Sequence, residues 1–323
     1  MTRRGTGGRV IPLSAGRRSG EKRSGPGRSG GERGGAAGSR GGGTVGGAVD
    51  FHLASCVAAA KVAGRVLLDH WGKRGALPIK EKGRNDFVTA ADRRAEEAVL
   101  RLLRARFPDH AIVAEESGES RGSGASGRGS REGRGSVGYR WFVDPLDGTT
   151  NYIHGVPLFG VSIGLADAEG MRAAAVFDPL REEMFTAARG QGAHLNGAPL
   201  KVARPGKLER ALLVTGIPFR SLDRVDAYLA SFRTFVHEAG GIRRDGSAAL
   251  DLAYVACGRY DGFWEMGLSS WDVAAGSLLV TEAGGVVTDF TGRAGYVESG
   301  DIIAASPETH SDMLRVVRAA YRK

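Results

Sequence analysis

The segment at residues 141–151, Trp-Phe-Val-Asp-Pro-Leu-Asp-Gly-Thr-Thr-Asn, constrains the fold of this chain more than any other. Its first three residues form an apolar run typical of a strand. We expect the strand to stop at Asp144-Pro145, because proline cannot donate to a continuing ladder of hydrogen bonds. A tight turn flanked by Asp144 and Asp147 should follow, and Gly148 allows the backbone to approach a ligand closely.

The two carboxylates of this turn indicate a cation site. Two such charges repel each other by roughly 4 kcal/mol at about 4 Å and an effective dielectric of about 20, so a fold keeps both ionised when cations lie between them. All ligand groups in the turn are oxygens, with no His or Cys, which favours Mg²⁺ over Zn²⁺. The alternative is an Asx-type turn that only joins two elements.

The charge of the chain is concentrated in its first 48 residues. The formal net charge of +9 suggests a nucleic-acid binder at first sight. Residues 1–48 carry +8 of it, from ten Arg or Lys and two Glu, and the rest of the chain sums to +1. With 17 glycines and almost no large apolar residues, this segment is predicted to be a disordered basic tail. Weak RNA binding by the tail is the alternative to a plain flexible extension.

Cysteine usage and hydropathy bear on the compartment. Cys56 and Cys257 lie in Ala-rich segments and suggest no disulfide framework, so we expect a reducing, cytoplasmic environment. No uncharged apolar run approaches 18 residues, which predicts no membrane span. The N-terminal segment has Arg but no apolar stretch of the kind found in secretory signals.

Hydrophobic periodicity predicts the elements of the first half, residues 49–190. A helix is expected over residues 51–71 with Asp50 as its N-cap, and a second helix should end before Pro108. A buried strand follows and ends at Glu115. Residues 118–138 are mostly Gly, Ser and Arg, with hardly an apolar side chain, which predicts a flexible insert beside the strand ends.

The second half, residues 191–323, shows a different pattern. An Asn196-Gly197 turn marks a hairpin. From residue 211 onwards, strand and helix patterns alternate. An α+β half that carries the metal motifs, followed by an α/β half, predicts layers of helix and sheet.

Acidic residues recur where apolar strands stop and where one helix begins. Glu115, Asp144 and Glu265 follow strand patterns, and Asp272 opens a helix. An N-cap or a helix-dipole partner is the ordinary interpretation of such an Asp. Strand ends and helix starts are also where α/β folds bind ligands.

Four carboxylates could together hold two or three divalent cations. If Glu115, Asp144, Asp147 and Asp272 converge, they form an oxygen-only cage. In two-metal sites, ions roughly 3.5–4 Å apart clamp the attacking and leaving oxygens of a phosphoryl transfer. The amides of residues 148–150, at the start of a helix, would then bind the phosphate.

Taken together, four motifs resemble the inositol monophosphatase family, over about residues 50–320. The motifs are Asp86-Phe-Val-Thr-Ala-Ala-Asp92, Glu115-Glu-Ser, Asp144-Pro-Leu-Asp-Gly-Thr-Thr-Asn, and Trp271-Asp-Val-Ala-Ala-Gly followed by Thr281-Glu-Ala-Gly-Gly. The segments Arg243-Arg-Asp-Gly-Ser-Ala-Ala-Leu-Asp-Leu and Phe263-Trp-Glu look most like the bacterial branch. The insert after Glu115 departs from the family pattern.

The resemblance implies a layered αβαβα sandwich of the sugar-phosphatase type, Mg²⁺ dependence with two or three ions, Li⁺ inhibition and a homodimer. The implied activity is hydrolysis of inositol 1-phosphate or a related polyol or sugar monophosphate. Fructose 1,6-bisphosphate, a nucleotide 3′-phosphate or histidinol phosphate are alternative substrates. Some bacterial relatives also act as antitermination factors associated with RNA polymerase, and the basic tail makes this a further alternative.

The resemblance also implies roles for individual residues. The implied metal ligands are Glu115, Asp144, the Leu146 carbonyl, Asp147 and Asp272. Catalysis is implied for Glu115, Thr149 and Asp92, with Thr149 orienting the attacking water and Asp92 as its hydrogen-bonded partner. Phosphate is implied to bind at Gly148 and Thr149. The implied substrate contacts are Asp147, Gly246, Ser247, Ala248, Glu265 and Asp272.

Overall fold

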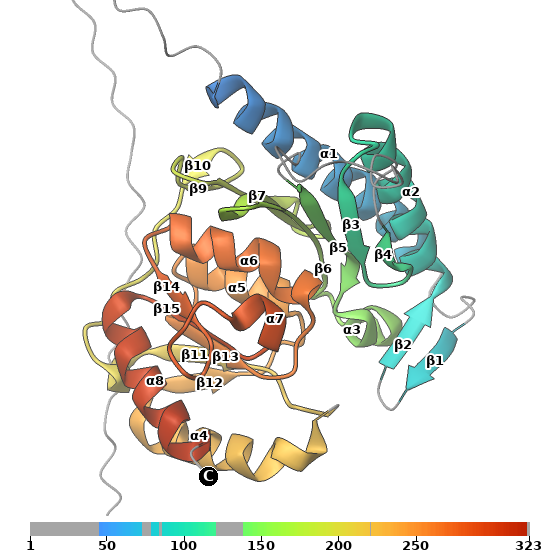
Figure 1. The fold of residues 1–323 in the computed structure, drawn as a ribbon. Helices are drawn as coiled ribbons and strands as arrows, with labels where there is room; N and C mark the ends of the chain where they lie inside the picture. The colour runs from blue at the N-terminus through green and yellow to red at the C-terminus, as the bar shows by residue number, and fades with distance from the viewer. Residues whose placement is uncertain (1–44, 73–78, 84–85, 121–137, 220, 322–323) are drawn as a thin grey trace, which may run out of the picture. The chain divides into compact units, whose positions relative to one another are not determined.

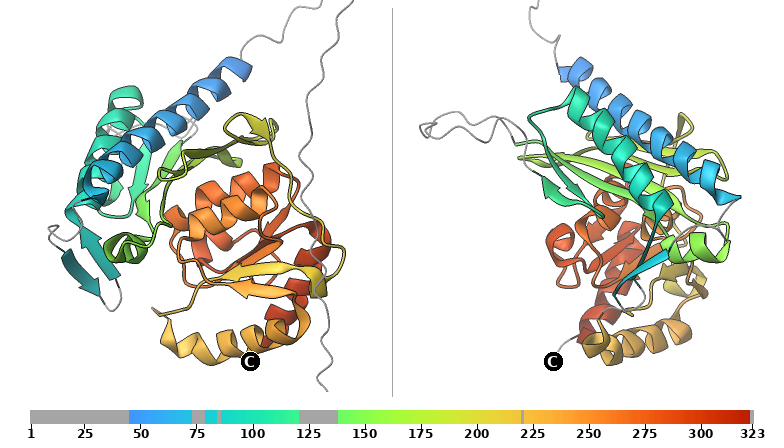
Figure 2. Two further views of the ribbon diagram at one scale, coloured as in Figure 1. Left: turned by 180° about the vertical axis from the view of Figure 1, so that it is seen from behind. Right: turned by 90° about the vertical axis from the view of Figure 1, so that its right-hand side faces the viewer.

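The computed structural model describes residues 45–72, 79–83, 86–120, 138–219 and 221–321, which belong to one compact unit. In these ranges two mixed sheets alternate with three layers of helices (Figure 1; Figure 2). The outer layer is α1 (Val45–Trp71) with α2 (Ala90–Arg106), the middle layer α5 (Ala248–Ala256) with α6 (Ser270–Glu282), and the far layer α4 (Val225–Glu238) with α8 (Pro307–Tyr321). The αβαβα sandwich expected from the resemblance is therefore confirmed.

The larger sheet lies between the outer and middle helices. Its described strands run in the order β10-β9-β8-β7-β6-β5-β3-β4, antiparallel except for the parallel pair β3–β5. Their bounds are β3 Ala111–Ala114, β4 Gly118–Ser120, β5 Arg140–Asp147, β6 Gly160–Asp167, β7 Gly170–Asp178, β8 Glu183–Ala188, β9 Ala193–Leu195 and β10 Ala198–Pro199. The predicted Asn196-Gly197 hairpin turn joins β9 and β10, and both residues have positive φ.

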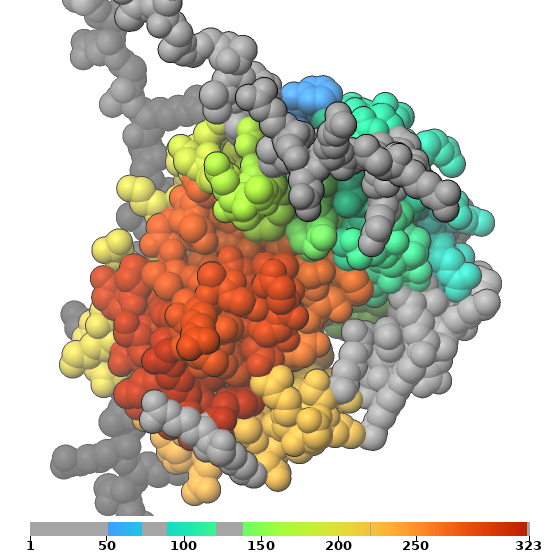
Figure 3. Space-filling model, viewed as in Figure 1, coloured from blue at the N-terminus to red at the C-terminus, as the bar shows by residue number. Residues whose placement is uncertain are grey.

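The smaller sheet lies between the middle and far helices, in the order β12-β11-β13-β15-β14. Its strands are β11 Leu212–Thr215, β12 Gly241–Arg243, β13 Gly262–Glu265, β14 Val286–Thr288 and β15 Ile302–Ala305. The remaining described elements are β1 Ile79–Gly83, β2 Asp86–Thr89, α3 Thr149–His154, α7 Tyr296–Ser299 and the single 3₁₀ turns Leu208–Arg210 and Leu222–Arg224. In the space-filling view, the green residues of the larger sheet directly adjoin the orange residues of the α6 region (Figure 3). The division into halves at residue 190 stays a prediction.

Helix α1 begins at Val45, five residues before the predicted N-cap, so Asp50 lies inside the helix. The predicted end of the tail at residue 48 falls within this helix, and residues 1–44 lie outside the described ranges. Val45 is followed by two glycines, which are poor helix formers, and this composition concealed the start. The cysteines behave as predicted: Cys56 is buried in the core, Cys257 is half-buried, and both are free.

By length and hydropathy, Phe51–Trp71 of α1 could cross a membrane, although no uncharged apolar run was found there. The helix carries Lys61 and Arg65 on its exposed side, and its opposite face is part of the protein core. That face packs on α2, β6 and β7. A core helix with one apolar face satisfies the same length and composition test, so the prediction of no membrane span is retained.

Strand β5 was predicted to stop at Asp144-Pro145. It continues instead to Asp147. Asp144 is paired with Ser162 of β6, and Asp147 with Gly160, so three steps on β5 match two on its neighbour. The extra residue is a β-bulge, where the missing N–H of Pro145 is tolerated. Residues three apart on a regular strand point to opposite faces. The bulge reverses this alternation and brings both carboxylates to one side.

The predicted insert at residues 118–138 begins with a strand rather than a flexible segment. Gly118–Ser120 forms β4, which pairs antiparallel with β3 just after Glu115. Strand pairing supplies backbone partners that the Gly and Ser composition did not suggest. Residues 121–137 lie outside the described ranges.

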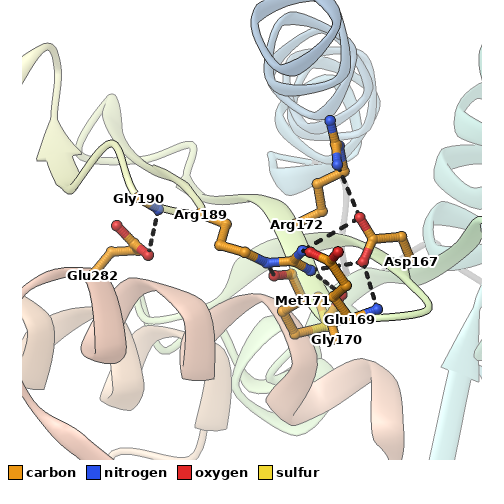
Figure 4. Close-up of polar contacts among 8 residues, drawn as sticks. All are labelled: Asp167, Glu169, Gly170, Met171, Arg172, Arg189, Gly190 and Glu282. Carbon is orange, nitrogen blue, oxygen red and sulfur yellow. Dashed lines mark hydrogen bonds and ion pairs between the residues drawn. The ribbon is translucent and has the colours of Figure 1, made fainter. Parts of the chain in front are cut away.

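Charged contacts fasten α6 to the larger sheet. Glu282 at the end of α6 accepts a hydrogen bond from Gly190 N at 2.9 Å (Figure 4). It also accepts one from Gly192 N at 2.8 Å. In the same figure, Arg189 binds Asp167 of β6 at 2.8 Å. The turn after β8 is therefore held from both sides. This anchors the helix whose first turn carries Asp272.

Candidate active site

A cavity of about 400 Å³ lies where β5, α3, α5, β13 and α6 meet. It brings together the predicted site residues Glu115, Asp144, Leu146, Asp147, Gly148, Thr149, Gly246, Ser247, Ala248, Glu265 and Asp272. Asp92 is absent from the wall and lies behind Thr149, to which it is hydrogen-bonded. The elements that converge are up to 157 positions apart in the sequence. The ligand and catalytic roles of these residues stay predictions.

Three carboxylates form the acidic centre of the cavity. One oxygen each of Asp144, Asp147 and Asp272 lies within 4.8 Å of the other two. Glu115 lines the same cavity but does not belong to this group of three. Its backbone N–H donates to Val143 O at 3.1 Å, and this bond places its backbone beside the middle of β5, next to Asp144.

Burial and mutual repulsion perturb the acidic centre. Asp144 is 2 % exposed. Burial raises the pKa of its carboxyl well above the ordinary value, and the charges of Glu115, Asp147 and Asp272 raise it further. The pKa of Asp147 is also raised by burial, although the Ser247 hydroxyl acts against this. Burial and the neighbouring carboxylates therefore disfavour the charged form of Asp144.

Asp147 is held in place by the start of α5. One of its oxygens, Oδ2, accepts the Ser247 hydroxyl at 2.7 Å and the Ala249 N–H at 2.6 Å. Exposed N–H groups and the helix dipole favour an anion at such a helix start. The Ser247 hydroxyl therefore donates to Asp147, and the predicted contact of Ser247 with substrate stays a prediction.

Thr149 opens α3 and contacts a buried carboxylate. Its Oγ1 lies 3.2 Å from Asp92 Oδ1 and 3.0 Å from the Leu146 carbonyl oxygen. A hydroxyl has one proton to donate, so one of these two acceptors receives it at a time. Asp92 also accepts hydrogen bonds from the backbone N–H and hydroxyl of Thr89, which caps α2. Burial raises the pKa of Asp92 to about 6.

Gly148 lies in a tightly packed junction, and its predicted contact with a ligand stays a prediction. Its φ of 93° is in the left-handed region that favours glycine. A Cβ there would lie 3.2 Å from Leu158 O and 3.3 Å from Gly246 O, which leaves little room for a side chain. Asn151 reinforces this junction, because its Nδ2 donates to Leu158 O and Asp245 O at 2.8 Å each.

Asp272 occupies the third position of the first turn of α6 and is not its N-cap. The cap is Ser269, whose backbone N–H donates to Asp272 Oδ2 at 2.7 Å. This reciprocal arrangement is a capping box. One oxygen of Asp272 therefore has a structural role in capping α6. The same carboxylate also belongs to the acidic centre.

The opposite wall contains residues that the sequence pattern did not single out. Gly216 packs directly against Glu265, since a Cβ at this position would lie 1.8 Å from Glu265 Oε1. Residues 216–219 and Arg244 also line the cavity. Arg244 was part of a motif used for the resemblance, but nothing local to that motif indicated that its side chain borders the cavity.

Comparison with known proteins gives concordant matches. A model described as the inositol monophosphatase family matches residues 50–321. The Nus factor SuhB of Pseudomonas aeruginosa is 48% identical over 262 residues, which cover 80% of this chain and 93% of that protein. The crystal structure of extragenic suppressor protein suhB from Bartonella henselae is 40% identical with a TM-score of 0.76, covering 83% of this chain and 98% of that one. The structure of inositol monophosphatase from Anabaena is 39% identical with a TM-score of 0.70, covering 84% and 97%.

Proposed function

The chain belongs to the inositol monophosphatase family, and from this premise we propose that it is a Mg²⁺-dependent phosphomonoesterase for inositol 1-phosphate or a related polyol monophosphate. One observation of its own supports the proposal: the clustering of Asp144, Asp147 and Asp272 at the floor of a polar cavity. The name of the Anabaena relative agrees with the proposed activity.

The donor set fits divalent magnesium. The clustered ligands are carboxylate oxygens, and the Leu146 carbonyl and Glu115 border the same space. Hard cations of this kind prefer oxygen ligands. The raised pKa of Asp144 is what a site built for cations should show in their absence. We propose that these five residues hold two or three ions, which supply polarisation of the phosphoryl group and acidification of the attacking water.

The remaining chemistry falls to Thr149, Asp92 and Glu115. When Thr149 donates its proton to Asp92, its oxygen is free to accept a hydrogen bond from water. Ionised Asp92 favours this orientation, since a charged acceptor forms the stronger bond. Glu115 is proposed to take part in removing the water proton. The N–H groups of Gly148 and Thr149 are proposed to bind phosphate oxygens.

The polyol is proposed to occupy the wall formed by residues 246–248 and Glu265. Glu265 can accept hydrogen bonds from neighbouring hydroxyls. Gly216 leaves the space that Glu265 occupies. Asp147 and Asp272 are proposed to lie near hydroxyls as well. This wall favours a hydroxyl-rich substrate over histidinol phosphate, while sugar and nucleotide phosphates remain to be compared with inositol 1-phosphate.

Metal removal tests the proposed function directly. The purified chain should release phosphate from inositol 1-phosphate with Mg²⁺, lose this activity in excess EDTA, and regain it when Mg²⁺ is restored. Phosphate release is the measurement, with the alternative substrates as a parallel panel. Failure to release phosphate from every member of the panel, with bound Mg²⁺ demonstrated by calorimetry, would contradict the proposal.

We further propose a homodimer, Li⁺ inhibition and a reducing intracellular location, none of which the fold itself requires. Li⁺ would compete for an oxygen site made for a small hard cation. Gel filtration with light scattering and an inhibition curve against Mg²⁺ concentration test the first two.

A second candidate function is contact with RNA during transcription. The relative from Pseudomonas aeruginosa is named a Nus factor, and residues 1–48 carry a charge of +8. If the tail contacts RNA, deletion of residues 1–48 should abolish binding to an RNA probe. The affinity of the full chain should also fall steeply with salt, because phosphate contacts release counterions. Equal, weak binding by both forms would remove this candidate.

A further inference from the structure

The cavity contains one cationic side chain, Arg244, that the proposed hydrolysis of a simple monophosphate does not use. Five carboxylates line it, namely Glu115, Asp144, Asp147, Glu265 and Asp272. Among the lining residues in the described ranges, Arg244 alone carries a positive side chain. Arg244 is exposed, and no described carboxylate forms an ion pair with it. Burial raises the pKa of the Asp251 carboxyl and the charge of Arg244 lowers it, but no described carboxylate lies within ion-pair distance of the guanidinium. Its donors are therefore available to a ligand.

The position of the guanidinium is determined by two contacts. Its Cζ lies 5.8 Å from the centroid of the Phe219 ring, a cation–π distance. Its Nη1 packs against the backbone of Gly246, where a Cβ would approach to 2.5 Å. The carbonyl of Gly246 in turn packs against Gly148. Arg244 is therefore held next to Gly246, which belongs to the proposed polyol wall.

From these contacts we propose that Arg244 binds a second anionic group on the substrate, so that the preferred substrates are polyol or sugar phosphates carrying an additional phosphate. The inference rests on the proposed function, since it assigns the reacting phosphate to the acidic centre. The planar fork of Arg matches phosphate or carboxylate oxygens in a bidentate manner, whereas a hydroxyl uses only one of its donors. A neutral polyol would leave most of the N–H donors of the Arg244 guanidinium without an acceptor.

Paired substrates test the proposal. Values of kcat/KM are measured for inositol 1-phosphate and inositol 1,4-bisphosphate, and for glucose 1-phosphate and glucuronic acid 1-phosphate. The second pair distinguishes an additional carboxylate from an additional phosphate. Arg244→Ala should lower kcat/KM for the bisphosphate by about tenfold, through KM, and change the monophosphate values by less than about threefold. For Arg244→Lys, kcat/KM for the bisphosphate should lie between the values of the wild type and Arg244→Ala. Lysine keeps the positive charge but cannot bind phosphate oxygens in the bidentate manner of a guanidinium.

Arg243→Ala is the matched control, since it removes the same charge from the adjacent exposed residue, whose Nη1 contacts only the Ile242 carbonyl among the described groups. It should leave the ratio of bisphosphate to monophosphate unchanged. An equal loss for both substrates in Arg244→Ala, or the same change of ratio in Arg243→Ala, would overturn the proposal.

A binding measurement separates this inference from the proposed catalysis. Calorimetry with inositol 1,4-bisphosphate and inositol 1-phosphate on the Ca²⁺-loaded chain requires no turnover. Selective loss of bisphosphate affinity in Arg244→Ala supports the role of Arg244 even if no phosphate is ever released. Equal affinity of the wild type and Arg244→Ala for the bisphosphate overturns it, even if the chain is an active phosphatase.

Discussion

Asp144→Asn and Asp147→Asn are each expected to reduce phosphate release by on the order of 1,000-fold, as removal of one group that stabilises transition-state charge can do. Each substitution keeps the shape of the side chain and removes one of the three clustered charges. The hydrogen bond from Leu146 N to Asp144 Oδ1, at 2.9 Å, can persist with an amide oxygen. The loss should therefore arise from the cation site rather than from the fold.

The stability of these variants should change in the opposite direction. The pKa of Asp144 is higher in the folded chain than its unfolded value, so the folded state holds the proton more tightly. Its contribution to the free energy of unfolding is therefore lost as pH rises above the unfolded value of about 4. Metal-free Asp144→Asn should melt at a higher temperature than the wild type at pH 7.5, with a difference that shrinks in acid.

Magnesium should reverse that order. The wild type gains about 2.7 kcal/mol when Mg²⁺ is present at about 100 times its dissociation constant, and a variant that cannot bind gains nothing. Melting curves with and without Mg²⁺ measure both effects. An Asp144→Asn variant with the same Mg²⁺ shift as the wild type, or with undiminished turnover, would show that the cluster is not the cation site.

Asp92→Asn is expected to lower kcat by about 100-fold, the low end of what general acid–base groups contribute. The hydroxyl of Thr149 would lose its charged acceptor at 3.2 Å and donate to the Leu146 carbonyl instead. Its oxygen would then be turned away from the water it is proposed to orient. Thr149→Val should produce a comparable loss, and Thr149→Ser should retain most of the rate.

The same Asp92 variant should be more stable at neutral pH. Its pKa is raised from 3.8 to about 6 by burial, and the side chain is 0 % exposed. Because the folded value is the higher one, this group costs stability above pH 6, and the cost disappears between about pH 6 and pH 4. The difference between the two pKa values corresponds to at most roughly 3 kcal/mol of the free energy of unfolding at pH 7.5.

Asp178→Asn is the matched control for this measurement. Asp178 is equally buried but pairs with Arg181 at 2.8 Å and accepts two backbone N–H groups. Removing its charge leaves the Arg181 guanidinium without this partner, so Asp178→Asn should destabilise the chain. Denaturant titrations from pH 5 to pH 8 compare the two variants. A destabilising effect of Asp92→Asn across this range would contradict the assignment of a buried charge to Asp92.

Local sequence carried enough information for most of the elements. The second helix, which ends before Pro108, and the hairpin at Asn196-Gly197 lie at their predicted positions, because helical periodicity and turn residues mark them directly. The same holds for the choice of oxygen-bearing residues in the turn after the apolar run at residues 141–143. Three boundaries were wrong: the start of α1 at Val45, the end of β5 at Asp147, and the start of the insert, where β4 forms. At the first and the third, glycine-rich composition gave no sign that helix packing or strand pairing would order the chain.

The sequence by itself determined which chemical groups the site contains: carboxylates after strands, a glycine before a helix, and no nitrogen or sulfur ligand in the turn. Only the tertiary structure decided that they face one another. The orientation of Asp144 and Asp147 depends on a single extra residue in the pairing of β5 with β6. Whether Arg244 borders the cavity depends on how β12 and α5 meet. Such contacts join residues far apart in the chain, so no short pattern specifies them, and a shift of one residue reverses which face a strand residue occupies.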